Sequence, residues 1–374
     1  MFKNGKPVVA GDFIGREEEL FRLRRSVENS NSIVLIAPRR YGKTSLILEL
    51  KHQYKANYIH IDLMNVYTKR ELALKIIDQS YKIAGFSSAI EQLKNQSVEL
   101  LKNIINHFST LSLSIDDLKI QTAQKLIGDK SDDELLEFAF NLPQIIADKL
   151  NIRIVFIIDE LGEITKFSKS EQLLQKMRAI FQLQDKITFV FAGSQYHLMQ
   201  KLFSSSNSAF FRFATVLNIM PMNTNDYKDF LIEKLAIEEV NITLEHIALI
   251  QNISNGLPYY IMKMANEIYF YSKFKDKKIN SISILRIALS IYNSEKDFIS
   301  LELLKVKGKK YFIEILKQIA NENNPYPVLE ALGVRSQNIN KIINELKTYG
   351  LIYKENNQYI VLDPFIKYYL QEKN

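Results

Sequence analysis

One short stretch combines residue types that can grip an anion. It contains small, basic and hydroxyl residues in an unbroken run: Ala37, Pro38, Arg39, Arg40, Tyr41, Gly42, Lys43, Thr44 and Ser45. The run resembles the pattern G-x-x-x-x-G-K-[ST], in which backbone N–H groups and a helix N-terminus converge on phosphate oxygens. In this pattern Gly42 permits close backbone approach, Lys43 bridges the β- and γ-phosphates, and Thr44 ligates Mg²⁺. The stretch therefore predicts a phosphate loop that binds ATP with Mg²⁺.

The loop departs from this pattern at its first position, where Ala37 stands in place of glycine. The substitution is costly only if the backbone there needs a positive φ. Arg39 and Arg40 have two open roles, because each can contact phosphate or merely brace the loop. We expect the loop to lie between a buried strand at residues 33–36 and a helix at residues 44–53. That placement favours a phosphate loop over a lysine-capped turn.

A second candidate group follows the apolar run at residues 154–158, which ends in Asp159 and Glu160. We expect Asp159 to hold Mg²⁺ through water and Glu160 to polarise the attacking water. A strand that ends in acidic surface residues is the alternative, and the upstream loop favours the functional interpretation. Ser194 follows the next strand and is a candidate sensor of the γ-phosphate. Gln195 is an alternative sensor, and a turn cap is an alternative role for Ser194.

These residues need a scaffold in which strands alternate with helices. The expected strands are apolar runs at residues 33–36, 58–63, 154–158, 187–192 and 216–220. The expected helices of this part lie at residues 16–28, 44–53 and 170–184, with further helical pattern over 69–150. Such alternation predicts an α/β fold with a parallel, doubly wound sheet, whose ligands bind beyond the carboxyl ends of the strands. Asp62 ends one such strand and can either reach Mg²⁺ through water or cap its turn.

The sequence divides into three predicted parts. Residues 1–222 form a P-loop ATPase core, with a helical insert at about 85–150. Residues 223–300 form a helical lid, with a break at residues 255–258. Residues 301–374 are expected to hold a helix, a short helix at 328–332, an amphipathic helix at 336–346, and a hairpin of strands 351–354 and 359–362. That order is typical of a winged helix-turn-helix domain.

If the winged helix binds double-stranded DNA, the outward face of its third helix enters the major groove. The candidate DNA contacts are polar residues of this helix and of the wing: Arg335, Gln337, Asn338, Lys341, Asn344 and Lys354. Residues 301–374 hold ten lysines and one arginine against seven glutamates and one aspartate, a net charge of +3. This charge is modest for a DNA-binding domain. A protein-contact or autoinhibitory module is therefore the open alternative.

Composition excludes several classes of site. The chain has no cysteine, which rules out disulfides, thiolate metal sites and cysteine nucleophiles. Its five histidines show no spacing typical of metal ligands. The net charge of +7 is spread along the chain and only permits an anionic partner. We expect a cytoplasmic protein with no membrane span, because no apolar stretch is long enough for a signal peptide or a spanning helix.

In combination, the motifs resemble those of the archaeal-type ATPase family within the AAA+/STAND group and, more distantly, origin-recognition ATPases. The resemblance rests on motifs spread from about residue 12 to 370: Phe13-Ile14-Gly15-Arg16-Glu17-Glu18-Glu19-Leu20, Pro38-Arg39-Arg40-Tyr41-Gly42-Lys43-Thr44-Ser45, Ile158-Asp159-Glu160, Ala192-Gly193-Ser194, Gly256-Leu257-Pro258 and Leu362-Asp363-Pro364. It covers almost the whole chain.

The resemblance, and not the spacing, implies several further roles. Phe13, Ile14, Gly15 and Arg16 should line the adenine pocket, and the lid segment with Gly256 and Pro258 should close over the adenine or ribose. Arg212 precedes the fifth strand, where such ATPases often carry an arginine that stabilises phosphate charge. It would act in cis, or in trans from a neighbouring subunit of a homo-oligomer. An exposed arginine at a helix end is the alternative.

Two functions follow from these expectations. The first is a slow ATP-hydrolysing molecular switch that couples nucleotide state to the winged helix and to DNA or a protein. The second is a nucleotide-loaded scaffold with negligible turnover. A small-molecule kinase is disfavoured, because no substrate motif is present and the C-terminal part would have no role.

Overall fold

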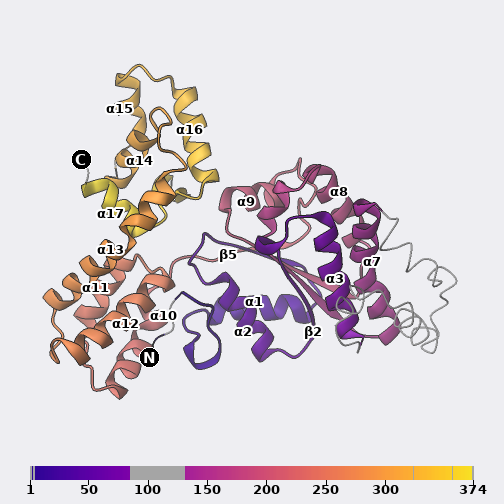
Figure 1. Cartoon of the computed structure of the whole chain (residues 1–374), viewed down its shortest axis with the longest axis horizontal. Helices are drawn as coiled ribbons and strands as arrows, with labels where there is room; N and C mark the ends of the chain where they lie inside the picture. The colour runs from indigo at the N-terminus through magenta and orange to yellow at the C-terminus, as the bar shows by residue number, and fades with distance from the viewer. Residues whose placement is uncertain (1, 3–4, 85–130, 323, 356, 373–374) are drawn as a thin grey trace.

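A five-stranded parallel sheet lies at the centre of the N-terminal part (Figure 1). The computed structural model describes residues 2, 5–84, 131–322, 324–355 and 357–372. The strands run in the order β2-β3-β4-β1-β5, with these bounds: β1 (Ile33–Ile36), β2 (Asn57–Asp62), β3 (Ile154–Asp159), β4 (Ile187–Gly193) and β5 (Thr215–Asn218). Every residue of β1, β3 and β4 is buried, as in strands covered on both faces. The predicted doubly wound parallel fold is confirmed.

Helices cover both faces of this sheet. One face carries α1 (Glu17–Glu28) and α2 (Lys43–Gln53). The other face carries a larger set: α3 (Lys69–Ile83), α7 (Asp132–Leu150), α8 (Ser170–Phe181) and α9 (Tyr196–Ser204). Side chains alternate between the two apolar layers, since Leu35 of β1 packs in the first and Val34 in the second. The second layer is rich in phenylalanine, including the stacked pair Phe181 and Phe189 at 4.2 Å.

The structure places α7 among the helices that cover the sheet. It begins at a capping box in which Ser131 and Glu134 satisfy each other's backbone N–H groups, and it packs along α3. The helical insert was expected at about 85–150, yet residues 132–150 form this crossover helix before β3. Their apolar face is buried in the second layer, which is the physical reason why they belong to the sheet's cover. Residues 85–130 of the expected insert lie outside the described residues.

The predicted lid contains four helices: α10 (Thr224–Ile237), α11 (Leu244–Ser254), α12 (Pro258–Phe274) and α13 (Ser281–Leu303). The predicted break at residues 255–258 is confirmed. Asn255 and Gly256 have positive φ angles of 48° and 70°, and Pro258 starts α12, where a missing N–H costs nothing. The expected boundary at residue 300 falls inside α13, which continues into the C-terminal part.

The C-terminal part has three helices, a hairpin and a last helix: α14 (Phe312–Ala320), α15 (Pro325–Ala331), α16 (Ser336–Thr348), β6 (Ile352–Glu355), β7 (Gln358–Val361) and α17 (Pro364–Glu372). We call residues 304–372 the C-terminal module. β6 and β7 are antiparallel. The hairpin turn is shorter than expected, because each four-residue strand lies one residue nearer the turn than predicted. Asn357 in the turn has a positive φ of 67°.

Several expected bounds were wrong. α17 was not predicted, although its start at Pro364 after Asp363 carries the usual signals of a cap and a first-turn proline. The helix expected over residues 170–184 ends at Phe181, and its continuation is a turn in which Leu183 and Gln184 donate to carbonyls three residues back. The strand expected at 216–220 is Thr215–Asn218, since only these residues pair with β1.

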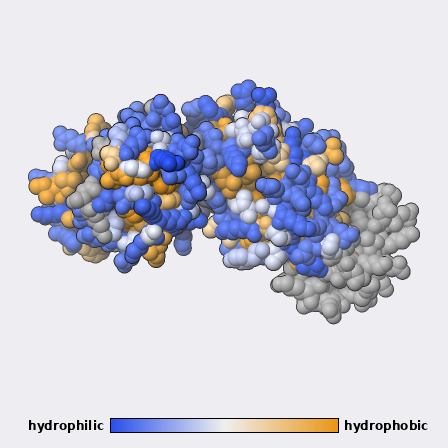
Figure 2. Space-filling view, turned by 90° about the horizontal axis from the view of Figure 1, so that it is seen from above, coloured by the Kyte–Doolittle hydropathy of each residue, from blue (hydrophilic) through white to orange (hydrophobic). Residues whose placement is uncertain are grey.

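One apolar cluster runs from the α1–α2 face of the sheet through the lid and into the C-terminal module. The face of the molecule seen in Figure 2 is mainly hydrophilic, with scattered apolar patches. Within the part of the chain that the structure describes, no helix is both long and apolar enough to cross a bilayer.

Candidate functional site

The predicted phosphate loop connects β1 to α2, as expected. Gly42 has a φ of 88°, and a Cβ built on it would meet nothing within 4 Å, so open space lies beside the backbone. Ala37 is fully buried and is not among the residues with positive φ. The alanine at the first position therefore brings no backbone strain. The loop's positive φ angles fall instead on Gly42 and Arg40.

Lys43 is buried at the start of α2. Its Nζ donates to the carbonyl oxygens of Ala37 at 2.8 Å and Pro38 at 3.1 Å, so the side chain folds back across its own loop. Burial lowers the pKa of Lys43, against the opposing charges of Glu160 and Asp159. Within the described residues no carboxylate forms an ion pair with this ammonium. A buried cation with only neutral acceptors is prepared for an anionic ligand.

Thr44 and Asp159 are in direct contact, which joins the phosphate loop to the end of β3. The Thr44 hydroxyl donates to Asp159 Oδ2 at 3.2 Å. Asp159 is buried, and burial together with the charge of Glu160 raises its pKa. Among the described residues no group of three histidines, cysteines or carboxylates could hold a metal ion. A hydroxyl and one carboxylate nevertheless suit Mg²⁺, which keeps most of its waters in such sites.

Glu160 and Ser194 are also brought together. Glu160 has a positive φ of 53°, and its Oε2 accepts from the backbone N–H of Ser194 at 2.8 Å and from the Ser194 hydroxyl at 2.7 Å. Gln195, the alternative sensor, donates instead to Glu163 Oε1 at 3.1 Å. Asp62 caps the turn after β2 by accepting from the N–H of Met64, and it pairs in register with Asp159. The structure thus connects Glu160 to Ser194 and leaves Gln195 bound elsewhere.

The segment expected to line the adenine pocket meets the lid. Arg16 is buried and donates to the carbonyl oxygens of Tyr41 at 3.3 Å and Met220 at 2.7 Å. Gly15 and Gly256 both pack against Met222, since a Cβ on Gly15 would lie 2.2 Å from its Cε and one on Gly256 would lie 2.3 Å from its carbonyl oxygen. Both glycines have positive φ. The two segments therefore converge on one residue of the core–lid junction.

The other residues of the predicted site have simpler surroundings. Phe13 and Ile14 are half-buried against the apolar cluster, and Pro258 is half-buried at the start of α12. Ser45 is turned toward the N-terminal segment, where its hydroxyl accepts from the N–H of Val8 at 3.1 Å. Pro38 is half-buried, Arg39 is exposed and Tyr41 is buried. These positions keep Ser45 occupied and leave Arg39 open to solvent.

Arg212 is exposed, has a positive φ of 55°, and lies over the ring of Phe211 with its Cζ 5.0 Å from the centroid. Its backbone N–H donates to the carbonyl of Phe203. None of these contacts joins it to the phosphate loop. The structure does not bring Arg212 together with Lys43 and Glu160, and its functional role stays a prediction.

The candidate DNA contacts are exposed residues of the C-terminal module. Six residues are solvent-exposed: Arg335, Gln337, Asn338, Lys341, Asn344 and Lys354. The opposite face of α16 buries Ile339, Ile342, Ile343 and Leu346, so the predicted amphipathic helix is confirmed. The last turn of α16 packs against α9 of the core, where burial and the nearby Lys347 lower the pKa of His197. This face is available to a partner, whereas the end of the helix is in contact with the core.

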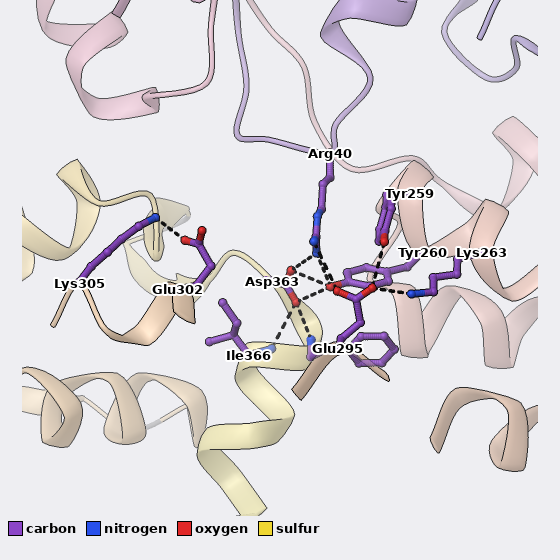
Figure 3. A network of polar contacts seen from close by, with 10 residues as sticks. Arg40, Tyr259, Tyr260, Lys263, Glu295, Glu302, Lys305, Asp363 and Ile366 are labelled. Carbon is purple, nitrogen blue, oxygen red and sulfur yellow. Dashed lines mark hydrogen bonds and ion pairs between the residues drawn. The ribbon is translucent and has the colours of Figure 1, made fainter. Parts of the chain in front are cut away.

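Sequence reasoning missed the main partners of Arg40. Its guanidinium reaches Asp363, which precedes α17, and Glu295 of α13, far from the loop in sequence (Figure 3). The only available signal was the tail motif Leu362-Asp363-Pro364, whose aspartate had no assigned role. The choice between contacting phosphate and bracing a neighbour could not be made from the sequence.

Comparisons with known proteins agree with this fold. The chain is similar to a Walker-type ATPase of Pyrococcus abyssi, with 20% identity and a TM-score of 0.71 over 98% of this chain and 99% of that chain. It is also similar to the ORC2 protein of Aeropyrum pernix in ADPNP–ADP complexes, with 12% identity and a TM-score of 0.58 over 96% of this chain and 92% of that chain. At these identities the likeness shows the fold alone.

A search among curated proteins found no match. A family described as an ATPase domain predominantly from Archaea matches residues 13–264, a span that holds the phosphate loop, the acidic pair and the first lid helices. With the fold and the contact of Thr44 with Asp159 in place, the chain belongs to this archaeal ATPase family.

Proposed function

We propose that this ATPase is a molecular switch, which binds Mg²⁺-ATP, hydrolyses it slowly, and couples its nucleotide state to the C-terminal module. The single observation that carries the proposal is the contact of Thr44 with Asp159 beside the buried Lys43. It places a cation, a hydroxyl and a carboxylate at one carboxyl edge of the sheet, where ligands of such folds bind.

The residues suit Mg²⁺-ATP. Gly42 leaves open space for phosphate beside the backbone, and Lys43 can exchange its two carbonyl acceptors for phosphate oxygens. Thr44 and Asp159 would hold Mg²⁺, directly and through water. When bound, Mg²⁺ neutralises charge that builds up on the phosphates. Phe13, Ile14, Gly15 and Arg16, with Gly256 and Pro258 opposite, would surround the adenine and ribose.

Glu160 is the proposed residue that orients and polarises the attacking water. In this structure its carboxylate accepts two hydrogen bonds from Ser194, so the residue proposed to sense the γ-phosphate also holds the residue that acts on water. Arg212 would stabilise phosphate charge. Its exposure favours the role in trans, from a neighbouring copy in a homo-oligomer.

Substitutions at two residues test the site. We expect Lys43→Ala to abolish binding of a fluorescent ATP analogue, because the buried ammonium that receives phosphate is lost. We expect Glu160→Gln to keep that binding and to lower phosphate release by roughly 10²–10⁴-fold, the range of general acid–base catalysis. Lys55→Ala is the matched control, since Lys55 is exposed before β2, at the opposite end of the strands.

Two outcomes would contradict the proposal at different points. If the wild-type protein showed no nucleotide affinity with magnesium, and Lys43→Ala changed nothing, the phosphate-loop assignment would be wrong. If the wild-type protein bound ATP but released phosphate no faster than Glu160→Gln and than a sample without protein, binding would stand, and the chain would be a nucleotide-loaded regulator of negligible turnover.

The proposed partner of the C-terminal module is double-stranded DNA, with α16 in the major groove. The exposed polar face of α16 beside the β6–β7 hairpin supports this assignment. A protein partner is the alternative, because the net charge of this part is small and the end of α16 already packs on protein at α9.

Salt dependence separates the two partners. We expect DNA affinity to fall steeply between low and moderate salt, and the double variant Arg335→Ala/Lys341→Ala to reduce both the affinity and the salt slope, because fewer counterions are released. Lys307→Ala removes an exposed charge before α14 and serves as the control. If the protein does not bind DNA, or if its DNA affinity changes neither with salt nor in the double variant, the proposed partner is a protein and not DNA.

A further inference from the structure

Arg40 lies at the tip of the phosphate loop, yet its side chain is occupied by the lid and the C-terminal module. Nη1 donates to the Tyr260 hydroxyl at 2.7 Å and to Asp363 Oδ2 at 3.0 Å, while Nη2 donates to Glu295 Oε2 at 3.4 Å. The guanidinium also lies over the rings of Tyr259 and Phe298, 4.4 and 4.5 Å from their centroids. Figure 3 shows Tyr259, Tyr260, Glu295 and Asp363 gathered around the end of the Arg40 side chain.

The partners of Arg40 are themselves held in place. Asp363 caps α17 by accepting from the N–H groups of Phe365 at 2.9 Å and Ile366 at 3.2 Å, and it also accepts from the Tyr260 hydroxyl. Glu295 accepts from Lys263 and from the Tyr259 hydroxyl. Arg40 and Lys263 thus balance the charges of Asp363 and Glu295. Without Arg40, the two carboxylates would face Lys263 alone and keep a net negative charge at the lid. This would be costly, since the cluster is largely shielded from solvent.

The C-terminal module also encloses the outer side of the loop. A cavity of 270 Å³ is lined on one side by Arg39 and Ser194 and on the other by residues 348–351 and Asp363. Its volume lies below the roughly 300–1,000 Å³ of ordinary ligand pockets. The contact of α16 with α9, which begins just after Ser194 and Gln195, closes the same side. The C-terminal module therefore lies against both the phosphate loop and the segment with Ser194, which would face the γ-phosphate.

We propose that Arg40 is a latch between the nucleotide site and the C-terminal module, and that its ion pairs with Asp363 and Glu295 exclude the ATP-bound arrangement of the loop. This inference rests on the proposed function. A triphosphate at residues 37–45 brings several negative charges toward a guanidinium that two carboxylates already hold. Phosphate and the carboxylates then compete for Arg40, and by linkage each weakens the other. Binding of ATP would free the module from the core.

Asp363→Asn is the sharpest test, because asparagine caps helices as well as aspartate and keeps the hydrogen bonds that start α17, while the charge that attracts Arg40 is removed. We expect this variant of the full-length protein to bind a fluorescent ATP analogue with Mg²⁺ more tightly than wild type, by roughly 5–150-fold, the usual range of coupling between sites. Glu302→Gln is the matched control, because Glu302 lies on α13, the helix that also carries Glu295, and it pairs with Lys305 and not with Arg40 (Figure 3).

A distance measurement reports on the latch independently of affinity. The chain has no cysteine, so dyes can be placed on introduced cysteines at the exposed positions Gln172 of α8 and Leu332 beside α15. We expect Mg²⁺-ATP to change the energy transfer between them in wild type and in Glu302→Gln. Asp363→Asn should show the changed value without nucleotide. If Asp363→Asn does not fold, Arg40→Gln provides the same distance test.

The outcomes separate the latch from the function on which it rests. Wild-type protein that binds ATP, together with Asp363→Asn at wild-type affinity and wild-type energy transfer, overturns the latch and leaves the ATPase assignment intact. If Asp363→Asn and Glu302→Gln changed the ATP affinity equally, the latch would also be overturned. The effect would then come from the net charge of the region and not from the partner of Arg40. Wild-type protein without nucleotide affinity overturns the proposed function itself.

Discussion

Burial acts in opposite directions on the two charges that define the nucleotide site. It lowers the pKa of Lys43 and raises the pKa of Asp159, so each residue carries its charge at a cost. Their direct partners in the structure, backbone carbonyls for Lys43 and the Thr44 hydroxyl for Asp159, offset only part of this cost. Phosphate oxygens and Mg²⁺ supply the opposite charges. Binding of phosphate and Mg²⁺ would therefore offset the cost of burying the charges of Lys43 and Asp159.

His60 gives a prediction for stability at the residue scale. Burial, with Lys51 nearby, lowers the pKa of His60 to about 4, and its Nε2 has no hydrogen-bond partner among the described residues. The unfolded chain takes up this proton near pH 6.5, so the histidine's contribution to stability is present above that pH and is lost as pH falls toward 4. We expect the free energy of unfolding to fall in this window by up to about 1.4 kcal/mol per pH unit from this one group.

Urea titrations between pH 4.5 and 7.5 would measure this slope. His60→Gln should flatten it, because glutamine does not titrate. His52→Gln is the control, since His52 is exposed and should leave the slope as it is. An unchanged slope in His60→Gln would show that other groups cause the pH dependence.

At the scale of elements, the junction of core and lid depends on Gly256, whose φ is 70°. A Cβ there would lie 2.3 Å from the Met222 carbonyl oxygen, and Met222 donates its own N–H to the Gly256 carbonyl. We expect Gly256→Ala to lower the free energy of unfolding by about 1–3 kcal/mol through strain, and to weaken ATP binding by moving the lid. Urea denaturation and an ATP titration measure the two effects.

Gly308→Ala is the matched control for this change. Gly308 has a similar φ of 82°, but a Cβ there meets nothing within 4 Å. It should therefore show the cost of positive φ without the clash. Equal losses of stability and ATP affinity in the two variants would mean that the contact with Met222 does not position the lid.

Elements with local signals were predictable from the sequence. The run Ile33–Ile36, the Gly42-Lys43-Thr44 turn and the break before Pro258 each carry their reason within a few residues. The contacts of Thr44 with Asp159 and of Glu160 with Ser194 followed from the rule that parallel strands end at one edge. The pairing of Arg40 with Asp363 was beyond such rules, because 323 residues separate them and only the packing of three parts brings them together.

At the scale of the whole molecule, the core, the lid and the C-terminal module share one apolar cluster and one partly buried set of ion pairs. A residue at the phosphate loop can thus change the position of a helix that is distant in sequence. The proposed switch needs such a connection, because a ligand shifts an equilibrium only by the difference in its affinity for the two states. Arg40 provides that difference, since its carboxylate partners lie outside the core.

The continuity of α13 has a mechanical consequence. This helix of 23 residues packs against α11 and α12 at one end and against α17 at the other. At a rise of 1.5 Å per residue it is a rod about 35 Å long. Turning one end by about 10° displaces the far end by about 6 Å over such a length. A small tilt of α13 that leaves the packing of the lid helices intact would therefore be enough to move the C-terminal module away from the core.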